Sequence, residues 1–171
     1  MINWLRNSKI AMWLLTVMRL YLGYQWTIDG FGKVTKGFDA QGFIMNAINN
    51  PVLTPEKATA YPHYVGFLKS FAQPNIAFFN FAVSWGELLV GLGLLFGTLT
   101  TLAAFFGMVM NFAYLFAGTI SVNPLFIILE IFFLMAGLNA GKIGLDRWVI
   151  PFFRKRLPFL KGDPNPDVSL K

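Results

Sequence analysis

The sequence predicts an all-α integral membrane protein, an up-down-up-down bundle of four helices with a long capping loop between the first two. Its composition predicts the membrane class, because 56% of the 171 residues are hydrophobic and only 13% are charged. Soluble domains usually carry about 25% charged residues, so this chain has too little polar surface for a globule in water. Four apolar segments approach the roughly 20 residues that a membrane helix needs.

The first predicted helix covers about residues 9–27, with Ser8 as its N-cap. Its basic start resembles that of a signal peptide. However, Arg19 interrupts the apolar run, and no small-residue cleavage site follows. We therefore expect this segment to be a retained membrane helix.

The other three predicted helices cover about residues 75–96, 100–117 and 124–141. Their two links are short and uncharged, so neighbouring helices must run antiparallel. The link between the first two helices, about 29–74, is too long for a simple connector. It contains FDAQGFIMNAINN and YPHYVGFLKSFAQP, two short amphipathic pieces typical of a membrane interface. We expect them to cap one mouth of the bundle.

Basic residues predict the orientation, because Lys and Arg favour the cytoplasmic side. Nine of the fourteen lie near the two ends of the chain and four in the long loop. We therefore expect a multi-pass membrane protein with both termini cytoplasmic and the cap, 29–74, outside. A single domain is expected over 1–150, followed by a basic, interfacial and disordered tail over 151–171. The net charge of +6 follows from this topology, so no nucleic-acid partner is expected.

The chain has no cysteine and one histidine. Thiol–disulfide chemistry and iron–sulfur ligation by this chain are therefore excluded. A single histidine also argues against haem or another metal site. We expect no metal and no covalently bound cofactor.

Four polar side chains fall inside the predicted helices: Arg19, Glu87, Asn111 and Glu130. At about 1.5 Å per residue, each lies roughly 15–18 Å from the cytoplasmic end of its helix. A charge inside a bilayer costs about 2.5–3.5 kcal/mol, so these groups need partners. We predict an Arg19–Glu87 ion pair that leaves Glu130 holding a proton. The reverse assignment and a coupled titration of the two carboxyls stay open, as does a pair that only locks the helices in register.

Each of these residues belongs to a stripe of small and polar residues at helical spacing. Small residues let helix backbones approach closely in lipid, so we expect the stripes to face inward and Leu and Phe to face lipid. The stripes are Thr16, Arg19, Gly23 and Trp26; Asn80, Ser84, Glu87 and Gly91; Ala104, Gly107, Asn111, Tyr114 and Gly118; and Glu130, Gly137 and Gly141.

Three stretches carry a resemblance to a known family: MRLYLGYQWTIDGFGKV, WGELLVGLGLLFGTLTTLAAFFGMVMN and LEIFFLMAGLNAGKIGLD. In order and spacing they resemble the DoxX/DoxD family of small four-helix bacterial membrane proteins, over about residues 10–150. The matching positions are Arg19 and Gly23; Glu87, Gly91 and Gly93; and Gly141, Leu145 and Asp146. The resemblance implies a membrane subunit of the thiosulfate:quinone oxidoreductase type, or a companion of redox enzymes. Whether this chain is itself catalytic is left open.

Two functions fit these features. The first is a quinone-linked oxidoreductase subunit, in which a cluster of Arg19, Glu87 and Glu130 binds a small ligand or carries a proton. A soluble or membrane partner then supplies the electrons. The second is a non-catalytic assembly or scaffold subunit, or a small proton-coupled transporter. A homo-oligomer is compatible with both. The expected ligand-binding residues are Asn111, Tyr114, Asn80 and Ser84, with Trp26 and Trp85 flanking a quinone ring.

Overall fold

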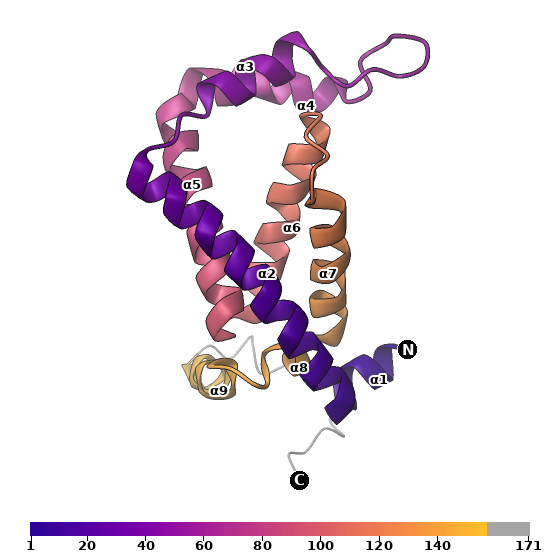
Figure 1. Ribbon diagram of the computed structural model, residues 1–171, viewed down its shortest axis with the longest axis vertical. Helices are drawn as coiled ribbons and strands as arrows, with labels where there is room; N and C mark the ends of the chain where they lie inside the picture. Colours follow the sequence, from indigo (N-terminus) through magenta and orange to yellow (C-terminus); the bar gives the residue numbers. More distant parts are fainter. Residues whose placement is uncertain (157–171) are drawn as a thin grey trace.

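The computed structural model describes residues 1–156, and the predicted all-α class is confirmed. The described residues contain no β-strand, only an isolated antiparallel bridge between Leu53 and Thr59. The cap helices α3 and α4 lie at one end of the molecule, and α1, α8 and α9 lie at the other (Figure 1). The helices are α1 (Ile2–Asn7), α2 (Lys9–Lys36), α3 (Gln41–Asn49), α4 (Pro62–Phe67), α5 (Ile76–Phe96), α6 (Thr100–Phe116), α7 (Asn123–Ala136), α8 (Leu138–Gly141) and α9 (Asp146–Arg156).

Helix α2 begins where the sequence predicts and ends later. The Ser8 hydroxyl accepts from the backbone N–H groups of Ile10 and Ala11, so it is the expected N-cap. The helix then continues past residue 27 to Lys36, because no breaker interrupts it before Gly37, which adopts a φ of 84°. Residues 29–36 therefore belong to this helix and not to the cap.

The C-terminal boundary of the cap, predicted at residue 74, also differs in the structure. Helix α4 continues through a π-helical turn, η1 (Leu68–Ala72), and a 3₁₀ turn, η2 (Gln73–Asn75), into α5. Pro74 lies in η2 and has no N–H for a regular helical bond, so the helix changes geometry there. The combined run Pro62–Phe96 is the one helix in residues 1–156 that is long and apolar enough to cross a membrane; α6 and α7 are apolar but shorter.

Helices α2 and α5 pack antiparallel along a seam of glycines. A Cβ atom on Gly23 would lie 2.5 Å from the backbone nitrogen of Leu95. A Cβ on Gly30 would overlap the backbone of Leu88, and one on Gly91 would overlap that of Thr27. Only hydrogen fits between the two backbones at these positions, so the glycines fix the register in which α2 meets α5.

We expect Gly91→Ala to lower the free energy of unfolding by about 1–3 kcal/mol, because its methyl group is forced into backbone that cannot rotate away. Thermal unfolding of the purified protein in detergent measures this effect. Gly32→Ala is the matched control on α2, since nothing lies within 4 Å of its added Cβ. Equal stability of the two variants would contradict the close approach at Gly91.

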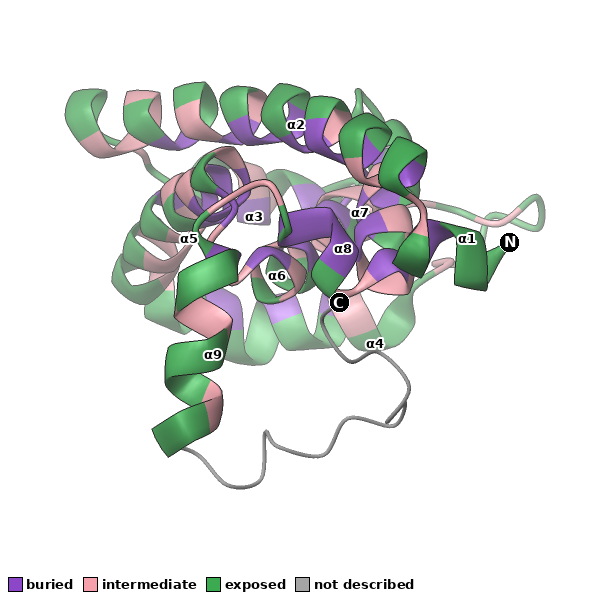
Figure 2. Ribbon diagram, turned by 90° about the horizontal axis from the view of Figure 1, so that it is seen from below, coloured by how far each residue is buried: buried purple, intermediate pink, exposed green. Residues whose placement is uncertain are grey.

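The polar stripes face inward, as expected. Arg19, Glu87, Asn111 and Glu130 are all buried, whereas most large apolar side chains on the outer helix faces are exposed. The view along the molecule shows this division on α2, whose outer side is exposed and whose inner side is buried (Figure 2). Gly118 departs from the expectation, because it is exposed and forms the turn after α6 with a φ of 88°.

Helix α9 is exposed along most of its length (Figure 2) and carries Arg154, Lys155 and Arg156 in its last turn. It runs across residue 150, where we expected the domain to end. Residues 151–156 are helical, and the remainder of the expected tail, 157–171, lies outside the described residues.

Candidate ligand cavity and its polar clusters

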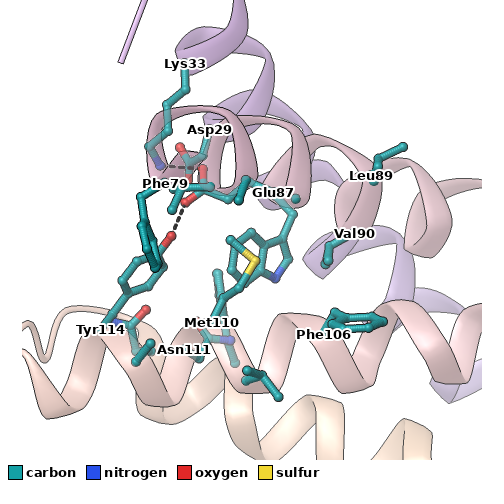
Figure 3. A pocket seen from close by; sticks show the side chains of 18 of the residues that line it. Asp29, Lys33, Phe79, Glu87, Leu89, Val90, Phe106, Met110, Asn111 and Tyr114 are labelled. Atoms are coloured by element: carbon teal, nitrogen blue, oxygen red, sulfur yellow. Dashed lines mark hydrogen bonds and ion pairs between the residues drawn. The ribbon is translucent and has the colours of Figure 1, made fainter. Parts of the chain in front are cut away.

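A cavity of about 1070 Å³ lies among α2, α5 and α6 and extends under the cap. Most of its lining is apolar, and polar side chains gather on one part of the wall (Figure 3). A large apolar cavity with a few convergent polar groups is the usual form of a small-molecule site. The polar side chains that line it include Asp29, Lys33, Glu87, Asn111 and Tyr114.

Three of these groups form one hydrogen-bonded cluster drawn from three helices. The Glu87 carboxyl on α5 forms an ion pair with Lys33 on α2 and accepts a hydrogen bond of 2.6 Å from the Tyr114 hydroxyl on α6. Glu87 is only 2% exposed, whereas the Lys33 side chain is 28% exposed. The cluster thus holds a buried carboxyl whose cationic partner reaches toward the surface.

The predicted Arg19–Glu87 pair is wrong. Leu88, next to Glu87, lies opposite Gly30, whereas Leu95 lies opposite Gly23. Leu95 lies about 12 Å along α5 from Glu87, at about 1.5 Å per residue. This register places Arg19 beyond the level of Leu95, and therefore still farther from Glu87. Counting depth from helix ends failed because the ends of α2 and α5 are not level.

Lys33 is the residue that we did not expect in the site. We had assigned it to the loop because it follows the predicted end of the first helix. A signal was present, since Lys33 continues the stripe of Gly23, Trp26 and Gly30 at helical spacing. That stripe becomes informative only once the helix is known to reach residue 36.

Arg19 instead binds the carboxyl end of α5. Its guanidinium donates to the carbonyl oxygen of Leu94 and, at 2.6 Å, to that of Ile143. The last carbonyls of a helix have no partner within the helix and carry its negative dipole end, so a buried cation is stabilised there. Arg19 does not line the cavity and acts as a clamp on the turn after α5.

Asp146 completes this clamp from the other side. Its carboxylate accepts hydrogen bonds from the backbone N–H groups of Leu99, at 2.6 Å, and Thr100, at 2.9 Å. These groups open α6, so Asp146 caps that helix. Leu99 has a φ of 49°, and Gly97 a φ of 64°. The clamp thus holds a turn that an isolated chain would resist.

Glu130 forms a separate buried cluster. Its two oxygens accept from the Asn111 side-chain amide at 3.1 and 2.9 Å, and it packs against Gly107, where a Cβ would overlap the carboxyl. The Trp26 indole lies nearby, but its N–H makes no hydrogen bond of ordinary geometry. Within residues 1–156 no Lys or Arg pairs with Glu130, which is 0% exposed and lies behind the cavity wall.

The other expected ligand-binding residues are divided between the cavity and the scaffold. Trp26, Asn111 and Tyr114 line the cavity. Asn80 and Ser84 do not: the Asn80 side chain accepts from the backbone N–H of Ala40, and the Ser84 hydroxyl donates to the Asn80 carbonyl. Trp85 is 43% exposed on the outer surface, away from the lining. Among residues 1–156, no group of three or more His, Cys, Asp or Glu side chains could hold a metal ion.

The family model described as DoxX matches residues 14–120, more than half of the chain. The chain belongs to the DoxX family. DoxX proteins are associated with membranes, which agrees with the exposed apolar faces of the long helices. The match contains the whole Lys33–Glu87–Tyr114 cluster, while Glu130 and Asp146 lie beyond its end. No curated protein and no solved structure shows significant similarity to this DoxX protein.

Proposed function

We propose that this DoxX protein is the membrane subunit of a quinone-linked oxidoreductase and that its cavity binds the quinone head. In this proposal α2, α5, α6 and α7 cross the bacterial cytoplasmic membrane as a four-helix up-down-up-down bundle, the core of a single domain. Both termini are cytoplasmic, and α3 and α4 form the opposite cap. The short connections after α5 and α6 support the antiparallel order.

The main support for this proposal is the Lys33–Glu87–Tyr114 cluster on the wall of a mostly apolar cavity. A quinone needs an apolar slot for its ring and hydrogen-bond donors for its carbonyl oxygens. Lys33 has three N–H donors, of which Glu87 occupies one, so two can meet a quinone carbonyl oxygen. The Tyr114 hydroxyl gives its single hydrogen to Glu87 and holds that carboxyl at the cavity wall. Cavity-lining Trp26 supplies an aromatic surface for the ring.

A bound quinone supplies the redox chemistry, since it takes up two electrons and two protons. On the protein side, Glu87 receives and gives protons through Tyr114 and the partly exposed Lys33. An ionised carboxylate without a cation is costly in apolar surroundings, so we infer that Glu130 holds a proton behind Asn111. Electrons come from a soluble or membrane redox partner, because this chain offers no thiol couple of its own.

We expect the wild-type protein, purified from native membranes, to carry menaquinone or ubiquinone near one per chain. Tyr114→Phe keeps the ring and removes the hydrogen bond that holds Glu87, and with it Lys33, at the cavity wall, so we expect its quinone affinity to fall about five- to tenfold. Titration of the purified protein with quinone, followed by tryptophan fluorescence, measures this change. Tyr24→Phe is the control, because Tyr24 is 57% exposed and does not line the cavity.

Absence of quinone from the purified protein, together with unchanged quinone reduction in membranes of a deletion strain, would contradict the proposal. That result would favour a non-catalytic assembly subunit or a small proton-coupled transporter.

A further inference from the structure

We propose, on the basis of the function above, that the ligand is a long-tailed amphiphile whose tail leaves the cavity sideways into the bilayer, between α5 and α6 past Gly86. The ring then binds at the Lys33–Glu87–Tyr114 cluster, and the tail fills the remaining apolar space. What this adds to the proposed function is the route by which the hydrocarbon tail of the quinone leaves the cavity.

The cavity is too large for a ring alone. Its volume of about 1070 Å³ exceeds the roughly 300–1,000 Å³ that holds a drug-sized ligand. Along α6 its lining extends from Tyr114 to Leu102, which is about 18 Å at about 1.5 Å per residue. A quinone ring held at the polar cluster leaves most of this length unfilled.

The wall changes from polar to apolar along that length. Beyond the polar cluster, the lining on α5 and α6 includes four large apolar side chains that are about half exposed, more than the walls of a closed cavity would be. Figure 3 shows two of them, Leu89 and Phe106. Side chains that border both the cavity and the outside mark an opening. In a membrane protein, that outer surface faces hydrocarbon, so an apolar tail can cross it without meeting water. The four residues are Leu89 at 62%, Leu102 at 49%, Phe106 at 51% and Val109 at 47% exposed.

The arrangement of the helices fits an opening on this side. Helices α5 and α6 touch near their connecting turn, where a Cβ on Gly93 would lie 2.9 Å from that of Ala103. From that turn they diverge toward the cap (Figure 1).

Gly86 lies at this opening and has no packing reason to be glycine. A Cβ added there would meet only the flexible side chain of Met110, with 3.4 Å to its sulfur, an ordinary contact. By contrast, Gly23, Gly30 and Gly91 each abut backbone. Glycine within a helix is less stable than alanine because it loses more backbone freedom on folding, so the gain at Gly86 is the space it leaves beside Met110.

The test compares two probes, a quinone with a long isoprenoid tail and the same ring bearing only a methyl group. Wild-type protein should bind the tailed probe more tightly. Gly86→Leu should lower the affinity for the tailed probe about tenfold or more, as expected for a side chain forced into filled space. It should change the affinity for the short probe less than about twofold. Each probe partitions into detergent equally in every experiment, so the ratio of its affinities for a variant and for wild type reports the site itself.

Two further variants make the result specific. Gly86→Leu combined with Met110→Ala should recover binding of the tailed probe, because the opening is widened again from α6. Gly32→Leu is the matched control, since nothing lies within 4 Å of a Cβ added at Gly32, and it should change the affinity for neither probe. If Gly86→Leu does not fold by thermal unfolding, Gly86→Ala replaces it and should show a smaller loss of the tailed probe alone.

Several outcomes would overturn the lateral exit. One is that Gly86→Leu lowers the affinity for both probes equally, or for neither. Another is that adding Met110→Ala to Gly86→Leu does not restore binding of the tailed probe. Wild-type protein that binds the short probe as tightly as the tailed one would also overturn it, while leaving the proposed quinone function intact. Wild-type protein that binds neither probe would defeat both proposals.

Discussion

Arg19→Met is expected to lower the free energy of unfolding by about 3–5 kcal/mol, the range for removing one partner from a buried charged network. The guanidinium is 2% exposed and binds the carbonyls of Leu94 and Ile143. Methionine fills a similar space but donates no hydrogen bond, so these oxygens lose their partner in a dry environment. Asp146 also loses its neighbouring positive charge.

Thermal unfolding in detergent measures this loss, which corresponds to a fall in Tm of about 6–20 °C for a domain of this size. Arg147→Met is the matched control, because Arg147 is exposed and stacks over Trp148. The variant should still bind quinone like wild type wherever it is folded, because Arg19 does not line the cavity. A stable Arg19→Met that has lost quinone binding would show instead that Arg19 acts on the ligand, as we first expected from the sequence.

Lys33→Met is expected to lower the free energy of unfolding by about 3 kcal/mol, the lower end of the range for breaking a buried pair, because Lys33 is partly exposed. The substitution leaves the Glu87 carboxylate, at 2% exposed, without its cation. The double variant Lys33→Met/Glu87→Gln removes both charges and keeps an acceptor for the Tyr114 hydroxyl. We therefore expect it to recover most of the stability lost in Lys33→Met.

A double-mutant cycle with Glu87→Gln measures the coupling between the two residues. Lys36→Met is the control, since Lys36 is exposed at the end of the same helix. Quinone affinity should stay low in the double variant although stability returns, because the cation that faces the cavity is gone. Equal stability of Lys33→Met and wild type would show that the ion pair does not hold the three helices together.

The three charged residues that were expected to form a single cluster belong to three separate groups, and Glu130 lies apart with Asn111. Arg19 and Asp146 hold the α5–α6 turn, and Lys33, Glu87 and Tyr114 place polar groups on the cavity wall. The terminal motif of the family resemblance thereby gains a physical reason. A Cβ on Gly141 would overlap the Asp146 carboxylate, and Leu145 donates its backbone N–H to the carbonyl of Phe96 at 3.0 Å.

The sequence by itself determined where the four long helices lie and the direction in which their polar stripes face. It did not determine every boundary, since α2 extends to Lys36 and the helix predicted over 124–141 breaks at Gly137, which has a φ of 57°. Hydrophobic spacing, Ser8 and the short links are local features, and local chemistry decides where a helix starts and which side is buried. The buried positions of Glu87, Asn111 and Glu130 were therefore predictable from the sequence.

Only the tertiary structure decided which polar groups meet. Partners depend on how far one helix slides along another, and one helical turn of slide exchanges every contact across the seam. That slide is set by the backbone contacts of Gly23, Gly30 and Gly91, whose meeting points no local pattern specifies. The same register brings Lys33 to Glu87 and carries Arg19 to the end of α5.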